Sequence, residues 1–225
     1  SIGYSLQMIL LFYGLVYGLY LFIIPLGAKF VARYGSEKSI VISTVFIVGL
    51  YLALFAIPYY SWLFYVAAVL YALQKMLYWP AFHADFAQNA KEIENAREIS
   101  TLTVATSLLF ILGPILAGAL ILLGGYGLMF LVVSIIFLLS NVPLLSSPEK
   151  FIPTTFSYRQ SFSELFSLQN RRELLAYMGF AEEFVALVIW PIFIAVIIGN
   201  DFTVGVVIGA TVLLSVIVTL VVGKW

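Results

Sequence analysis

The sequence contains no cysteine, one histidine and few charged side chains. The absence of cysteine excludes disulfide bonds, thiolate nucleophiles and sulfur-ligated metals, and one histidine cannot build a histidine-based metal cluster. The formal net charge is zero, and no basic face indicates a nucleic-acid partner. We therefore expect neither a metal nor a cofactor, and no nucleic acid among the partners.

Apolar sequence, by contrast, is abundant. The chain is 63% hydrophobic and 10% charged over 225 residues, whereas soluble globular domains carry roughly 25% charged residues. A helix needs ~20 apolar residues to cross a bilayer, and runs of about that length recur along the chain. They predict an all-α polytopic transmembrane bundle of seven spans, at residues 6–31, 39–57, 62–84, 99–123, 127–145, 174–198 and 203–223.

Lysine and arginine sort between two kinds of connection. One kind is charged and the other consists of short turns without Lys or Arg; the charged connections are 29–38, 85–98 and 146–173, and the turns are 57–61, 124–127 and 199–203. By the positive-inside rule the charged connections are cytoplasmic. The N-terminus is then outside and the C-terminus inside. The basic residues on the cytoplasmic side are Lys29, Arg33, Lys38, Lys91, Arg97, Lys150, Arg159, Arg171, Arg172 and Lys224.

The connection at 146–173 is the longest and divides the chain into five spans before it and two after it. Within it, Phe162, Leu165 and Phe166 recur at helical spacing between serines and charged residues. This pattern predicts an amphipathic surface helix at the membrane interface. A regulatory docking helix is the alternative.

Two adjacent acids, Glu182 and Glu183, lie inside the apolar run 174–198. Arg172, the nearest basic residue, is ten residues before Glu182, a distance of ~15 Å along a helix and therefore near mid-membrane. Acids at that depth are costly and indicate function by default. Two carboxylates this close do not both ionise, which suits proton binding and release. The alternative is a protonated Glu hydrogen-bonded to a neighbouring helix, without a role in transport.

A second charge lies inside the span 62–84. Lys75 is followed by Trp79 and His83 at four-residue intervals, so the three residues form a stripe on one helix face. Lys75 either carries a paired charge in a cavity or extends its side chain toward the cytoplasm. Trp79 and Trp190 each precede a proline, which frees a backbone carbonyl that can line a cavity or simply marks a packing kink. We name Lys75, Trp79, His83 and Trp190, together with the two glutamates, as candidate substrate-binding or proton-binding residues.

Two pairs of glycines predict close helix packing. Gly14 with Gly18, and Gly205 with Gly209, have the spacing that brings two small residues onto one helix face. Interfaces between membrane helices are enriched in such pairs because the backbones can then approach closely. We expect close helix contacts at both pairs.

The stretch "GAKFVARYGSEK" at 27–38 resembles the signature of the major facilitator superfamily in the loop between its second and third helices. Arg33, Gly35 and Lys38 fit this signature, whereas Ala28 takes the place of its first Gly and Ala32 that of its usual Asp. The resemblance implies that Arg33, Gly35 and Lys38 form a gating loop. A tight turn there predicts a positive φ at Gly35.

A second stretch, "GPILAG" at 113–118, is similar to the core of the motif in the fifth helix of the family. Gly113, Pro114 and Gly118 match that motif, and "GGYGLMF" after it resembles the turn before the sixth helix. Both stretches occur in the family's order. The resemblance therefore implies helices 2–8 of a twelve-helix protein built from two parallel halves. The implied parts are helices 2–6 at 1–145, the central cytoplasmic loop at 146–173, and helices 7–8 at 174–225.

The function that the resemblance implies is secondary active transport, not enzymatic catalysis. The protein would move a small solute across the plasma or inner membrane of a cell by alternating access, and the two glutamates suggest proton coupling. A membrane scaffold or sensor that keeps the same fold is one alternative. An intramembrane enzyme is another, although one histidine and no cysteine offer little for catalysis. Because the chain starts with Ser1 and both ends are apolar, we expect it to be part of a longer polypeptide.

Overall fold

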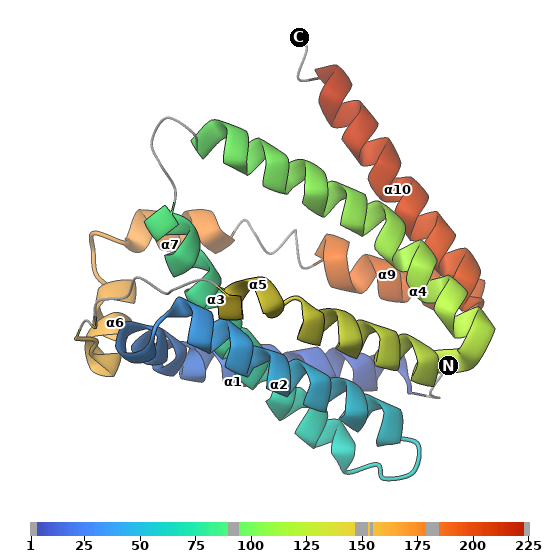
Figure 1. Cartoon of the computed structure of the whole chain (residues 1–225), viewed down its shortest axis with the longest axis horizontal. Coiled ribbons are helices and arrows are strands. Elements are labelled where there is room, and N and C mark those ends of the chain that lie inside the picture. The colour runs from blue at the N-terminus through green and yellow to red at the C-terminus, as the bar shows by residue number, and fades with distance from the viewer. Residues whose placement is uncertain (1–3, 90–94, 147–152, 154, 179–184, 223–225) are drawn as a thin grey trace. The chain divides into compact units, whose positions relative to one another are not determined.

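A computed structural model describes residues 4–89, 95–146, 153, 155–178 and 185–222 of the chain (Figure 1). Within these residues every element is a helix, so the predicted all-α class is confirmed. The elements are α1 (Leu6–Tyr34), α2 (Ser36–Ala56), α3 (Leu63–Asn89), α4 (Asn95–Leu139), α5 (Val142–Ser146), α6 (Tyr158–Leu165), α7 (Arg171–Met178), the π-helical turn η1 (Val185–Ile189), α9 (Trp190–Ile198) and α10 (Asp201–Val222).

Four helices of the described chain are long and apolar enough to cross a membrane: Leu6–Tyr34, Ser36–Ala56, Val104–Ser146 and Asp201–Val218. The third has 43 residues, a length of about 65 Å at 1.5 Å per residue, which is twice the ~30 Å hydrocarbon core. Its helical backbone breaks at Gly124 (φ −147°, ψ 16°) and Gly125 (φ 70°, ψ −175°). The predicted turn at 124–127 is therefore present, and it separates two lengths of helix.

The predicted span at 62–84 corresponds to α3, which is a 27-residue helix but is not among the four. It is more polar than its neighbours because it carries Gln74, Lys75, His83 and Asp85. The predicted span at 174–198 corresponds to α7, η1 and α9, between which residues 179–184 lie outside the described residues. The described helices are long and apolar enough for a membrane protein, and the count of seven spans stays a prediction.

The chain forms two compact units, which are described separately. Unit 1 comprises Ser1–Asn89 and Phe130–Met178, and unit 2 comprises Ala90–Met129 and Gly179–Trp225. In unit 1 both α1 and α2 pack on α3. Its larger core cluster joins α2 residues at helical spacing to the start of α3, through Ile47, Leu50, Ala53, Ile57, Phe64 and Ala67.

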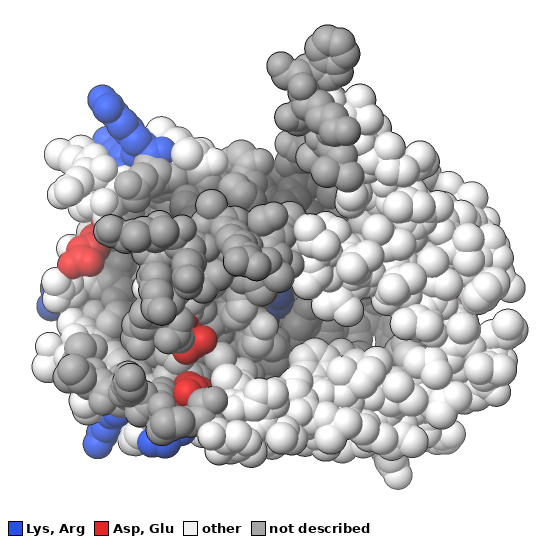
Figure 2. All heavy atoms as spheres, turned by 45° about the horizontal axis from the view of Figure 1, so that its top comes forward, with Lys and Arg blue, Asp and Glu red and all other residues white. Residues whose placement is uncertain are grey.

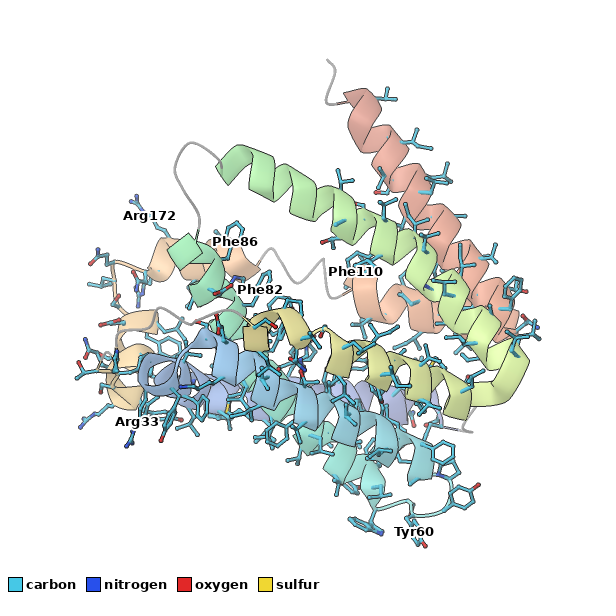
Figure 3. The ribbon with its side chains drawn as sticks, viewed as in Figure 1. Arg33, Tyr60, Phe82, Phe86, Phe110 and Arg172 are labelled. Atoms are coloured by element: carbon cyan, nitrogen blue, oxygen red, sulfur yellow. The ribbon has the colours of Figure 1, made fainter. Side chains whose placement is uncertain are left out.

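The two ends of unit 1 differ in chemistry. In Figure 3 Arg33, at the end of α1, and Tyr60, between α2 and α3, lie at opposite ends of this bundle. Most of the described surface visible in Figure 2 is uncharged. An uncharged flank between a basic end and an aromatic end is the pattern expected of helices in hydrocarbon.

The amphipathic pattern at 157–170 forms a short helix, α6. Ser157 caps its start, accepting a hydrogen bond from the Gln160 amide at 3.4 Å. The Tyr158 hydroxyl donates to the Phe22 carbonyl of α1 at 2.9 Å, and this hydrogen bond holds α6 against α1 within unit 1. Phe166, just after the helix, is 67% exposed. A helix is therefore present where the pattern predicts one, and its location at the membrane interface stays a prediction.

Candidate functional site

The predicted gating loop is reduced to one residue, Gly35, at which α1 ends and α2 begins. Its φ is 99°, and its amide donates to the Val31 carbonyl at 2.9 Å. The predicted positive φ is confirmed, and a side chain at this position would strain the backbone. Arg33 lies in the last turn of α1, where helix carbonyls attract a cation, and its guanidinium is 5.3 Å from the Tyr34 ring centroid. Arg33 and Lys38 are both exposed.

Just before this loop, α1 crosses α3 closely at Gly27. A Cβ atom added to Gly27 would overlap the Met76 backbone carbonyl and lie 2.9 Å from the Met76 Cγ. One residue after Met76, the Leu77 carbonyl accepts a hydrogen bond from the Ser39 hydroxyl of α2 at 2.8 Å. The segment 76–77 therefore joins all three helices. Sequence reasoning missed Gly27, although it directly precedes Ala28, where the family's motif begins.

The most unusual buried group of unit 1 is the ammonium of Lys75. The residue is 9% exposed near the middle of α3. Its Nζ lies 5.1 Å from the ring centroid of Tyr17 on α1 and 4.8 Å from that of Tyr71, one turn earlier on α3. Within the described residues no carboxylate pairs with it. The side chain points across to α1, and whether Lys75 serves a cavity or extends toward the cytoplasm stays a prediction.

The environment of Lys75 explains how a cation is tolerated there. A lysine at the centre of a membrane helix costs ~2.5–3.5 kcal/mol on insertion scales. Each aromatic face attracts the ammonium by ~0.5–2 kcal/mol, more where water is excluded. Two rings therefore offset much of the cost. The rings supply no formal negative charge, so among the described residues the site carries the positive charge of Lys75.

Only two of the three residues in the predicted stripe Lys75, Trp79 and His83 contact each other. The Trp79 and His83 rings stack, with centroids 5.7 Å apart and an angle of 26° between planes. Trp79 is 40% exposed and His83 is also exposed. Lys75 is instead buried against α1. The structure brings Trp79 to His83 but brings Lys75 to tyrosines.

A cavity that the sequence did not reveal lies between α2, α3 and the end of α4, and its mostly apolar wall includes several polar side chains. Its volume is about 270 Å³, and Ser43, Thr44, Gln74 and Tyr78 are among the residues that line it. Gln74 is 9% exposed, and its amide has no hydrogen-bond partner within the described part of the chain. The Thr44 hydroxyl donates to the Asn141 Oδ1 at 3.2 Å. The volume exceeds that of one water molecule, and the polar side chains occupy only part of the wall.

In unit 2 the helix-5 motif contacts the backbone of α10. A Cβ at Gly118 would lie 2.8 Å from the Phe202 Cα, one at Gly205 would overlap the Pro114 carbonyl, and one at Gly209 would lie 2.5 Å from the Ile111 carbonyl. Gly205 and Gly209 therefore mark a close helix contact, as predicted. Gly113 has no heavy atom within 4 Å of an added Cβ. Of the motif residues, Pro114 and Gly118 are at the contact and Gly113 is not.

A hydrogen bond links the turns at the end of the same interface. The Tyr126 hydroxyl, just after the Gly124–Gly125 break, donates to the Asp201 Oδ2 at 2.9 Å. Asp201 begins α10, where a carboxylate is favoured by the helix dipole. Asn200 accepts from the Thr203 amide at 2.9 Å. These contacts fix the start of α10 beside the turn at 124–127.

The first pair of glycines behaves differently from the second. A Cβ at Gly14 or Gly18 would meet no heavy atom within 4 Å in the described part of the chain. The two glycines instead line an apolar groove of about 410 Å³ beside Tyr65 and Val69 of α3. The predicted close contact at this pair is not found within the described residues, where no helix backbone lies against the face that carries the two glycines.

The remaining candidates lie near η1. Glu182 and Glu183 are outside the described residues, so their predicted place in a cavity is untested. Trp190 is 51% exposed and stacks on Phe193, with ring centroids 5.7 Å apart. Pro191 follows the point where the π-helical turn η1 passes into α9. The helix is therefore irregular next to Pro191, where the proline predicts a freed backbone carbonyl.

Within the described residues no group of three or more His, Cys, Asp or Glu could hold a metal ion. Comparison with protein families gives one result that covers the chain from end to end. The family model described as Major Facilitator Superfamily matches residues 1–225. Comparisons with individual curated proteins and with solved structures found no match.

Proposed function

Since this chain belongs to the major facilitator superfamily, a family of membrane transporters, we propose that it provides helices 2–8 of a secondary transporter. The transporter moves a small solute by alternating access of two helical halves around a central site. On this assignment residues 1–145 belong to the first half, 146–173 form the cytoplasmic connection, and 174–225 begin the second half. The seven spans are those predicted from hydropathy.

The observation that carries this proposal is the contact between α4 and α10. On the proposed numbering, residues 95–123 of α4 are helix 5 of the first half and α10 is helix 8 of the second. Their contact is backbone to backbone at Gly118 and Gly205, with the Tyr126–Asp201 hydrogen bond at one end. An interface of small residues can separate without leaving large side chains unpacked. This is what two halves that rock against each other need.

The gating role of Arg33, Gly35 and Lys38 belongs to the same proposal. Gly35 is the single residue between α1 and α2, and its positive φ allows the chain to turn from one helix into the other. The exposed cations next to it are free to contact another part of the protein or lipid headgroups. Movement of this end would therefore be transmitted along both helices.

We assign proton coupling to Glu182 and Glu183, because an ionisable acid near mid-membrane is costly unless it serves transport. The test is uptake of a panel of anionic, neutral and cationic solutes into liposomes containing the whole protein, under an imposed pH gradient. Glu182→Gln or Glu183→Gln fixes the neutral state. We expect one of these changes to abolish gradient-driven uptake while solute exchange continues.

The other glutamate, ~100° around the helix, is expected to tolerate the change. Unchanged pH dependence in both variants would contradict proton coupling but not transport. If the wild-type protein moves no solute of the panel under any gradient, the transporter proposal fails and the scaffold or sensor alternative is favoured.

The proposed orientation places the Arg33–Lys38 end of unit 1 in the cytoplasm. Cysteines at Lys38 and Tyr60 would bracket α2, and both positions are exposed. Since these 225 residues contain no cysteine, each new cysteine is the sole labelling site within them, and any cysteine elsewhere in the whole protein is first replaced by serine. We expect an impermeant maleimide added to intact cells to label Tyr60→Cys and not Lys38→Cys. The reverse pattern would invert the orientation and contradict the helix numbering.

A further inference from the structure

The buried charge of Lys75 lies in an unusual setting for a membrane helix. The side chain is 9% exposed, and its Nζ lies over the Tyr17 and Tyr71 rings at 5.1 and 4.8 Å. An ammonium carries three donors and no acceptor, and neither ring supplies a formal negative charge. In the part of the chain that the structure describes, no acid neutralises it.

The side chain of Lys75 extends from α3 toward the middle of α1. Lys75 is near the middle of α3 and Tyr17 is near the middle of α1. The side chain therefore crosses between the two helices at mid-height instead of following α3 to an end. Tyr20 and Tyr71 pack against the same small cluster of Val16, Ala68 and Ala72, which holds the aromatic wall in position. We call Lys75 with the Tyr17 and Tyr71 rings the cage. Tyr17 is 38% exposed, so the cage is open on the side of Tyr17.

The positive charge of Lys75 and the aromatic faces of Tyr17 and Tyr71 together indicate the class of solute that would bind. A single ammonium balances one negative charge, and a bound dianion would leave a net charge at a depth where charge is costly. Phosphate groups are typically held by several donors or by a guanidinium fork, and the cage contains one lysine. Aromatic faces next to the cation suit an apolar or aromatic body.

We propose that Lys75 binds the carboxylate of the transported solute and that this solute is a small organic monoanion, its apolar part lying on Tyr17 and Tyr71. This proposal rests on the proposed transport function. The loaded site is electrically neutral and the unloaded site is positive. While it is bound to Lys75 in the membrane interior, the monoanion therefore forms part of a neutral pair.

The test uses the whole protein and a matched set of probes. Benzoate carries one negative charge, benzamide has the same ring without charge, and phthalate carries two charges. Binding is measured by the tryptophan fluorescence of the purified protein, since Trp79 lies one turn from Lys75, and uptake is measured in liposomes. We expect binding of benzoate and uptake faster than in protein-free liposomes, and for benzamide and phthalate neither binding nor uptake above that of protein-free liposomes.

The variants separate charge from shape. Lys75→Met keeps the length of the side chain and removes its charge, and we expect it to weaken benzoate binding on the order of tenfold or more. Lys75→Arg retains the charge and should bind more tightly than Lys75→Met. The control is Lys29→Met, which removes one charge from the exposed surface of α1 and should bind as the wild type does.

Each of the following results would overturn the proposal. Benzoate and benzamide could bind with equal affinity, or benzoate binding could be unchanged in Lys75→Met. The wild-type protein could also neither bind nor transport any of a series of aliphatic and aromatic monocarboxylates. The last measurement needs no variant, so a folding defect in Lys75→Met cannot mask it. If neutral or cationic solutes are transported equally by wild type and Lys75→Met, transport stands and the anion site fails.

Discussion

Replacing Gly27 with alanine is expected to destabilise the protein more than any other exchange of one glycine for alanine in unit 1. The added methyl group would overlap the Met76 backbone carbonyl, and a backbone cannot move aside as a flexible side chain can. Overpacking of this kind costs about 1–3 kcal/mol, and we expect the upper end of that range. The measurement is the midpoint of unfolding of the purified protein, in detergent, by tryptophan fluorescence.

The matched control is Gly14→Ala, in the same helix. A Cβ at Gly14 would meet no described heavy atom within 4 Å, and alanine is favoured over glycine in a helix by about 1 kcal/mol. Gly14→Ala should therefore leave the midpoint unchanged or raise it. Equal effects of the two exchanges would mean that α1 and α3 do not cross closely at Gly27.

Replacing Gly205 with alanine is expected to affect transport more than folding. Its Cβ would overlap the Pro114 carbonyl when α4 and α10 are in contact, and would have room when the proposed halves separate. A penalty of about 2 kcal/mol on the closed contact shifts the equilibrium between the two states roughly 30-fold. A carrier must pass through both states, so uptake should fall by on the order of tenfold or more while solute binding continues.

The state of the interface can be read directly in this variant. A single cysteine at Phe202, beside Gly118, should react faster with a thiol reagent in the Gly205→Ala background than in the wild-type background. Gly113→Ala is the control because an added Cβ there meets no described heavy atom within 4 Å. If Gly205→Ala and Gly113→Ala transport equally well, the α4–α10 contact does not open and close during the cycle.

Helix positions were predictable from the sequence because hydropathy is a local property. The apolar runs at 6–31 and 39–57 correspond to α1 and α2 within a few residues. The turn chemistry was also local. Gly35 has the predicted positive φ, and the Gly124–Gly125 pair breaks α4 where a turn was expected. These features depend on a residue and its immediate neighbours in the chain.

Contacts between helices were less predictable, as the two glycine pairs show. Gly14 with Gly18 and Gly205 with Gly209 have identical spacing, yet only the second pair lies against another backbone. Spacing shows which residues share a helix face, and it does not show which neighbour that face meets. Gly27, which has no partner at this spacing in α1, makes the closest crossing in unit 1.

The candidate site illustrates the same limit. That Lys75 lies in a predicted span was readable from the sequence, but its contact with Tyr17 depends on how α1 crosses α3. The buried amide of Gln74 and the Thr44–Asn141 hydrogen bond were missed for the same reason. The pair Glu182 and Glu183 lies outside the described residues, so the prediction that they bind protons still depends on experiment.

The polarity of α3 has a consequence for the way the protein enters the membrane. Alone at the translocon, a helix with a central lysine faces a cost of ~2.5–3.5 kcal/mol for that residue. The groups that make Lys75 and the middle of α3 tolerable are Tyr17 on α1 and Ser39 on α2. Both helices precede α3 in the chain, so the ribosome delivers the partners before the segment that needs them. If α3 spans the membrane as predicted, its integration is a step assisted by α1 and α2, and the order of synthesis then contributes to its insertion.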